Sequence, residues 1–154
     1  MDRRAFLGAG ALIALSAGGF VAADGQTLFY TAITEDFPGG ILTALEAHTK
    51  AVAGEITLID IRRPDEWAKT GSGEGAHRID LRIDDFATLV QEAAGGDLNA
   101  PIALICARGV RSARTSNQLI NAGFTNIIDV PEGMLGSAAG SGWLARGLPV
   151  VKDS

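Results

Sequence analysis

The sequence predicts a single α/β domain with a central, mainly parallel sheet and helices on both faces. Three short apolar runs, residues 55–60, 101–106 and 126–130, have the continuous character of buried parallel strands. Segments with helical spacing separate these runs, and strands that alternate with helices form a parallel sheet covered on both sides. The chain has 154 residues, of which 47% are hydrophobic, and this is enough for one core.

The segment before the first strand is predicted to hold a lead-in and one helix. Residues 24–40 form the lead-in, with a short strand expected at 28–32. From 41 to 52 the apolar residues fall at helical spacing, and Gly54 follows as a stop.

Between the first and second strands the sequence predicts a short helix, an extended piece and a longer helix. Pro64 suits the first turn of a helix over residues 64–70, which a Gly-Ser-Gly loop ends. Residues 75–81 are expected to be extended. Asp84 or Asp85 can then cap a helix that stops at the next pair of glycines.

After the second strand the pattern predicts one more helix. It covers residues 112–121, with Leu119 and Ile120 facing the core and Gly123 as its stop. The third strand follows, and residues 142–151 close the domain.

Composition excludes several classes of function. The formal net charge of −5 argues against a nucleic-acid surface or a basic membrane patch, so we expect no nucleic-acid partner. A single cysteine cannot form an intramolecular disulfide, and one cysteine with two histidines cannot supply a Cys/His zinc site. No clustered acidic motif indicates a metal site.

Residues 1–23 have the pattern of an export signal. Arg3 and Arg4 precede 19 uncharged residues, and small residues stand at the end of this stretch, so we expect cleavage before Asp24. The paired arginines resemble the twin-arginine signal R-R-x-F-L, which implies a folded bacterial protein exported to the periplasm. The alternative is an uncleaved inner-membrane anchor, which four glycines within the stretch disfavour.

The stretch ICARGVRSA places Cys106 at the end of the second strand, where sites in parallel sheets lie. Gly109 permits a sharp turn, which points successive N–H groups inward as an anion nest. The start of a helix, Arg108 and Arg111 add positive charge, and residues 98–128 contain no Asp or Glu. These influences favour the thiolate over the thiol.

A second interpretation of Cys106 is a small hydrophobe that closes a strand, because free cysteine is among the most buried residue types. Its place before a glycine and two arginines favours a functional thiol. The first strand ends at Asp60, and Arg62 and Arg63 follow, so two more arginines are expected to reach the same rim.

Three segments resemble the rhodanese family. Residues 58–81 resemble its first signature, with a D-x-R strand end and a G-x-x-x-G-A turn. Residues 106–134 resemble the active-site loop, its helix and the following strand and glycine turn, and residues 143–150 resemble the closing segment. The resemblance spans residues 41–151, and it implies a rhodanese-like three-layer domain over 41–154.

The resemblance implies a sulfurtransferase of the thiosulfate:cyanide type. Cys106 would accept a sulfane sulfur as a persulfide and pass it to a thiophilic acceptor, with no cofactor beyond this covalent intermediate. The implied partners are a small anionic sulfur donor, a thiol or cyanide acceptor, and a periplasmic reductant that protects the lone thiol from oxidation. The implied substrate-binding residues are Ala107, Arg108, Gly109, Val110, Arg111 and Arg62, with Asp60 and Ser112 in support.

Two other functions stay open. A non-catalytic rhodanese-like module could bind a periplasmic partner, although such a module needs no thiol at Cys106. Cysteine-based phosphatases and arsenate reductases resemble C-x-x-x-x-x-R, but Ser112 holds the last position here and Arg111 comes one residue early.

The sequence also departs from the family pattern. Ala107 stands where arginine is frequent, and Glu66 stands where thiosulfate-specialised members can carry a basic residue. These departures put thiosulfate as the natural donor in question. Residues 134–142, rich in Gly, Ser and Ala, are expected to form a surface loop or a flap beside the site.

Overall fold

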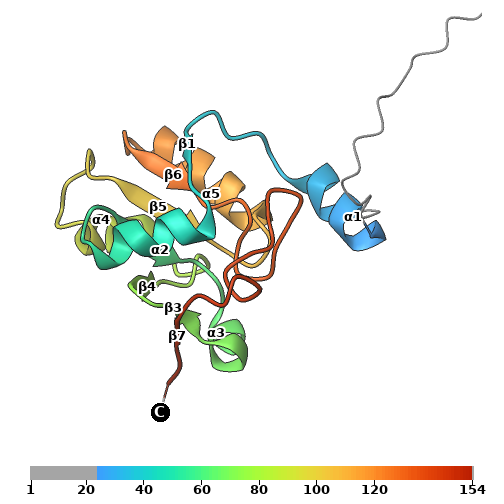
Figure 1. Ribbon diagram of the computed structural model, residues 1–154. Helices are drawn as coiled ribbons and strands as arrows, with labels where there is room; N and C mark the ends of the chain where they lie inside the picture. Colours follow the sequence, from blue (N-terminus) through green and yellow to red (C-terminus); the bar gives the residue numbers. More distant parts are fainter. Residues whose placement is uncertain (1–23, 154) are drawn as a thin grey trace, which may run out of the picture.

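The computed structural model describes residues 24–153, so the export signal predicted for residues 1–23 lies outside the described part. A five-stranded parallel sheet forms its centre, in the order β1-β6-β5-β2-β4 (Figure 1). The strands are β1 (Gly40–Ile41), β2 (Thr57–Asp60), β4 (Ala76–Arg78), β5 (Ile102–Ile105) and β6 (Ile127–Asp129). A separate antiparallel pair joins β3 (Ser72–Gly73) to β7 (Val150–Val151). The predicted α/β class with a mainly parallel sheet is confirmed.

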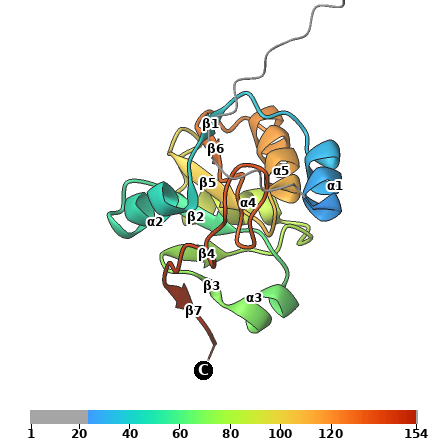
Figure 2. The same ribbon diagram turned by 45° about the vertical axis from the view of Figure 1, so that its right-hand side comes forward.

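Helices cover both faces of the sheet (Figure 2). Helix α2 (Ala44–Val52) lies on one face, and α4 (Phe86–Ala93) and α5 (Val110–Asn121) lie on the other. Helix α1 (Gly25–Ile33) packs beside α5, and α3 (Pro64–Thr70) follows β2. Successive strand residues point to opposite faces, so Ile59 packs with α4 and α5 while Leu58 packs with α2. Trp143, fully buried, lies with α2 on the second face. Within the described residues no helix is long and apolar enough to cross a membrane.

The strand predicted at residues 28–32 is wrong, because this segment lies in helix α1. The side chain of Asp24 accepts a hydrogen bond from the N–H of Thr27 at 2.7 Å and caps the helix. Thr31 adds a hydroxyl bond to the carbonyl of Thr27. The β-branched and aromatic composition favoured a strand, but the N-cap and the packing of α1 beside α5 override it.

The helix predicted from residue 41 begins at Ala44 instead. Ile41 belongs to β1, and the N–H of Leu42 donates to the carbonyl of Asp129 at 3.0 Å, which continues the pairing with β6. Thr43 is the N-cap, and it forms a capping box with Glu46.

Two smaller corrections concern the later helices. Helix α5 begins at Val110, two residues earlier than predicted, because Gly109 already serves as its N-cap. Leu119 is buried as expected, but Ile120 is 40% exposed and does not face the core. Asp85 is the N-cap residue of α4 as predicted, although its side chain makes no capping hydrogen bond.

Candidate active site

Cys106 follows β5 directly, and the turn after it leads into α5. Gly109 has φ +85°, in the left-handed region that glycine favours, and this lets the helix start at once. The first turn of α5 therefore lies against the end of the strand, with Ser112 fully buried beside the thiol.

Two backbone N–H groups point at the sulfur of Cys106. The N–H of Gly109 lies 3.2 Å from Sγ, and the N–H of Ser112 lies 3.4 Å from it. The thiol in turn donates to Oγ of Ser112 at 3.6 Å. Donors aimed at one atom at the start of a helix stabilise negative charge there. Among residues 107–111, which the resemblance implies bind the substrate, only Gly109 makes this contact, and Ser112 adds the second donor.

A cavity of about 370 Å³ opens onto Cys106, whose residue surface is 1% exposed. One wall comes from α1, which contributes Tyr30 and Ile33, and Leu135 faces in from the segment after β6. These walls are largely apolar. The remaining lining residues are Arg63, Glu66, Ala107, Arg108, Val110 and Arg111.

Arg111 reaches this cavity but is paired with Glu66. Its two terminal nitrogens donate to the two carboxylate oxygens, each at 2.7 Å. Burial by itself would raise the pKa of Glu66, but the bonds from Arg111 and from the N–H of Arg63 lower it to about 2. The stretch around Cys106 contains no acid, yet α3 brings one in from a distant part of the sequence and neutralises the arginine.

Arg62 does not line the cavity, which corrects its predicted role in substrate binding. Its side chain is 1% exposed, and Nε and Nη2 donate to Asp60 at 3.0 and 2.8 Å. Nη1 donates to Thr70 and Nη2 also to the carbonyl of Gly71. Asp60 further accepts from the hydroxyl of Ser72 at 2.7 Å. The pair holds the end of α3, and of Arg62 and Arg63 only Arg63 lines the cavity.

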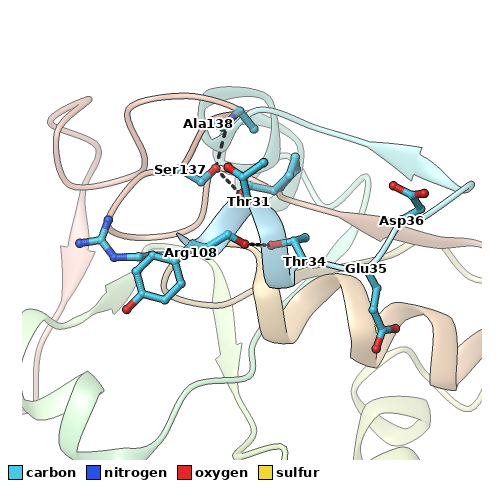
Figure 3. Close-up of a pocket in the computed structure, with 10 residues that line it drawn as sticks. Thr31, Thr34, Glu35, Asp36, Arg108, Ser137 and Ala138 are labelled. Atoms are coloured by element: carbon cyan, nitrogen blue, oxygen red, sulfur yellow. Dashed lines mark hydrogen bonds between the residues drawn. The ribbon is translucent and has the colours of Figure 1, made fainter. Parts of the chain in front are cut away.

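Arg108 lies between the Cys106 cavity and a second one. Its guanidinium sits 5.3 Å from the ring centroid of Tyr30, which is cation–π range, and Nη1 donates to the carbonyl of Gly136 at 3.3 Å. The second cavity is about 220 Å³ in volume, and Figure 3 shows Arg108, Thr31 and Ser137 around it. Arg108 is therefore the arginine of the active-site loop that no carboxylate pairs in the described part of the chain.

The Gly/Ser/Ala segment 134–142 is anchored at its base by Glu132. This carboxylate is 1% exposed and accepts from the N–H groups of Ala44 and Gly142, both at 2.8 Å, and from Nε of Arg146. The N–H of Leu135 donates to the carbonyl of Ala107, so the segment also binds the active-site loop. Sequence patterns gave no sign of this anchor.

The described residues include no group of three or more His, Cys, Asp or Glu side chains placed to hold a metal ion. The site is defined instead by a buried thiol at the carboxyl end of a central strand, cradled by the start of a helix. The fold and the site together place the protein in a class: an α/β domain whose site is built around a cysteine.

A model of the rhodanese-like domain family matches residues 43–139. The chain belongs to the rhodanese-like domain family. Among curated proteins, the uncharacterized protein RP600 of Rickettsia prowazekii is 24% identical over 102 residues, which is 60% of this chain and 80% of that protein.

Solved structures of the same fold include sulfurtransferases. The polysulfide-sulfur transferase homodimer of Wolinella succinogenes is 25% identical with a TM-score of 0.58, covering 84% of this chain and 86% of that one. The thiosulfate sulfurtransferase of Pseudomonas aeruginosa is 21% identical with a TM-score of 0.60, and the match covers 83% of this chain and 23% of that one. Rv0390 of M. tuberculosis is 23% identical with a TM-score of 0.57, and the match covers 77% of this chain and 100% of that one.

Proposed function

We propose that the protein is a sulfurtransferase that carries sulfane sulfur as a persulfide on Cys106. The observation that supports this function is the pair of N–H donors, from Gly109 and Ser112, aimed at a thiol that opens onto a cavity. A binding module without catalysis would need neither the thiol nor the donors. The chain belongs to the rhodanese-like domain family, and two solved structures similar to it are described as sulfur transferases. Both findings agree with this function.

The proposed reaction has two displacements. The Cys106 thiolate attacks the sulfane sulfur of the donor, a new S–S bond forms, and the leaving group departs with the electron pair of the broken donor bond. An acceptor thiolate or cyanide then attacks the outer sulfur, and Cys106 leaves as the thiolate. The N–H groups stabilise the sulfur anion at the start and end of the cycle. No electron is gained or lost overall.

Cys106 is expected to gain and lose one sulfur atom. The measurement is the intact mass of the protein before and after a sulfur donor, either thiosulfate or a polysulfide, and then after cyanide. We expect the mass of one sulfur atom to appear and to disappear with cyanide, and no change in Cys106→Ser. No added sulfur from either donor would overturn the proposal in favour of a binding module.

We further propose that the donor has an extended apolar body, such as the sulfur chain of a polysulfide or the organic group of a persulfide, and that its negative charge is less concentrated than that of thiosulfate. Tyr30, Ile33 and Leu135 make the wall apolar, and Glu66 cancels the charge of Arg111. Thiosulfate is a compact dianion, and the cavity offers it only Arg108 and Arg63 in return. The similar protein from Wolinella succinogenes is described as a polysulfide-sulfur transferase, which agrees with this choice.

Glu66→Gln is expected to raise kcat/KM for thiosulfate about tenfold, while the value for an organic persulfide, whose reacting group carries at most one negative charge, changes less. The reason is that the amide keeps the helix cap but frees the positive charge of Arg111, and tenfold corresponds to about 1.4 kcal/mol in the transition state. Steady-state rates with both donors provide the measurement. Glu46→Gln, at the same position of the capping box of α2, is the matched control. An unchanged or lower thiosulfate rate would contradict the role of Glu66.

The place of action is also a proposal. We propose that residues 1–23 direct the protein to the periplasm, where a thiol or cyanide would accept the sulfur and a reductant would keep Cys106 usable. Protein from a periplasmic fraction should then have the mass of a chain that begins at Asp24.

A further inference from the structure

A third cavity, about 300 Å³ in volume, is lined by three arginines and one leucine. These residues are Arg63, Leu81, Arg82 and Arg111, and we call this space the arginine cavity. Each arginine follows a different strand: Arg63 follows β2, Arg82 follows β4, and Arg111 lies in the first turn of α5 after β5. The three strands are neighbours in the sheet, and ligands of parallel sheets bind outside the carboxyl ends of the strands.

The arginine cavity adjoins the cavity that opens onto Cys106. Arg63 and Arg111 line both cavities, so the two spaces share a wall. A molecule whose sulfur reaches Cys106 can therefore place its other end beside the arginines. Tyr30 and Ile33 form the apolar wall of the Cys106 cavity, so the arginines are a second, chemically different surface for the same molecule.

The guanidinium of Arg63 makes no hydrogen bond to a described residue. Its Nε lies 3.6 Å from Oε2 of Glu66 and 3.9 Å from Oδ1 of Asp65. Glu66 accepts instead from the side chain of Arg111 and from the backbone N–H of Arg63. The side chain of Arg63 is 50% exposed, so its terminal nitrogens are free to bind a ligand.

Arg82 also keeps one terminal nitrogen free. It donates to Asp80 through Nε and Nη2, at 3.0 and 2.6 Å, whereas Nη1 donates to no described residue. Arg111 gives both of its terminal nitrogens to Glu66, so it forms part of the wall with its charge balanced. Arg63 and Arg82 are thus the two arginines that can bind an anion, and planar guanidinium groups suit a carboxylate.

We propose that Arg63 and Arg82 bind a carboxylate of the thiol that accepts the sulfur from Cys106. The acceptor is then a carboxylate-bearing thiol whose carbon chain runs past Arg63 from one cavity into the other. Its thiolate attacks the outer sulfur of the Cys106 persulfide, a new S–S bond forms, and Cys106 leaves as the thiolate with the electron pair of the broken bond. The product is an organic persulfide with the same carboxylate. The inference rests on the proposed sulfurtransferase function, which supplies the loaded Cys106.

The two arginines hold the carboxylate and not the reacting sulfur atoms. A contact that is equally strong in the bound acceptor and in the transition state lowers the half-saturating concentration and leaves the limiting rate unchanged. The side chains of Arg63 and Arg82 are 50% and 58% exposed, and salt screens charges that are open to water. The preference for a carboxylate should therefore weaken as the ionic strength rises.

The test starts from protein that has been loaded with sulfur by a polysulfide and freed from the excess. This protein is mixed with mercaptohexanoate or with mercaptohexanol, two thiols with the same carbon chain that end in a carboxylate and in a neutral hydroxyl. Intact mass records the loss of the sulfur atom with time. At low thiol concentration we expect mercaptohexanoate to remove the sulfur about tenfold faster, and about threefold faster or less in about 1 M salt.

Arg63→Gln and Arg82→Gln should each reduce this preference about threefold or more, through a higher half-saturating concentration of mercaptohexanoate, and the double variant should abolish it. Arg63→Lys keeps the positive charge and should keep part of the preference. Lys69→Gln is the matched control, because Lys69 is exposed on α3 and lines neither cavity. It removes one positive charge from the same helix and should keep the wild-type preference.

Equal rates for the two thiols in the wild-type protein would overturn the proposal, and so would a preference that survives in the double variant. A limiting rate that falls equally with both thiols would show that the arginines only maintain the structure, and would also overturn it. Failure of the proposed function appears earlier, as protein that gains no sulfur from the donor. Failure of this inference alone appears as loaded protein that does not distinguish the two thiols.

Discussion

Replacing Arg62 with methionine is expected to lower the free energy of unfolding by about 3–5 kcal/mol, which is typical when a buried ion pair loses one partner. Asp60 is fully buried and would keep as partners only the hydroxyl of Ser72 and the N–H of residue 62. The bonds from Arg62 to Thr70 and Gly71, which hold the end of α3, would also be lost. Unfolding in urea, followed by a spectroscopic signal, gives the difference.

The chain provides a matched control for this prediction. Arg82 binds Asp80 with the same set of bonds, from its N–H, Nε and Nη2, at the same spacing of two residues. Its side chain is 58% exposed, so water replaces the arginine when it is removed. Arg82→Met should therefore change the free energy of unfolding far less than Arg62→Met. Equal losses would show that the bonding pattern, rather than burial, sets the stability.

Gly109→Ala is expected to lower the rate of persulfide formation about 100-fold, the effect of removing one well-placed donor from an anion site. A Cβ atom at this position would lie 2.3 Å from the carbonyl oxygen of Pro131, so the loop must shift. That shift takes the N–H of residue 109 away from Sγ of Cys106. The backbone at φ +85° adds about 1–2 kcal/mol of strain for any residue with a side chain. Single-turnover mass measurements with an added donor report the rate.

The variant Gly96→Ala distinguishes the effect of backbone strain from the effect of the steric clash that an added Cβ atom causes at Gly109. Gly96 has φ +84°, close to that of Gly109, but no atom lies within 4 Å of its added Cβ. This variant should lose a similar amount of stability from the backbone and keep the wild-type rate of persulfide formation. If Gly109→Ala also kept that rate, the N–H of Gly109 would have no part in the chemistry.

Local patterns were sufficient for most of the fold. The three apolar runs became β2, β5 and β6, because a strand buried on both faces must be apolar throughout. Helix α3 spans the predicted residues 64–70, since proline at its start and Gly71 at its end act through their own backbone. Helix α1 was missed because its side chains favour a strand and none is buried, so its conformation depends on the cap and on α5.

The site, too, has a part that local patterns predict and a part that depends on distant segments of the chain. The turn from Cys106 to Ser112 is contiguous, so its shape follows from Gly109 and the helix that begins there. Glu66 and Tyr30 come from helices far away in the sequence, and no short-range pattern places them beside Cys106. The sequence therefore predicted a strongly positive loop, whereas α3 brings in an acid that neutralises one of its arginines.

The motif Asp-x-Arg occurs twice, at residues 60–62 and 80–82, and the two copies have the same local bonding. The pairing is local, like the strands, α3 and the turn at Cys106, because each depends on neighbours within a few residues, but Arg62 was predicted to bind substrate rather than Asp60. Only the tertiary structure decided that both partners of the first pair are buried, whereas Arg82 of the second pair is exposed. Strand β2 lies between β5 and β4, and β4 is at the edge of the sheet. The solvation of a charge depends on everything packed around it, and that is set by parts of the chain far from the motif.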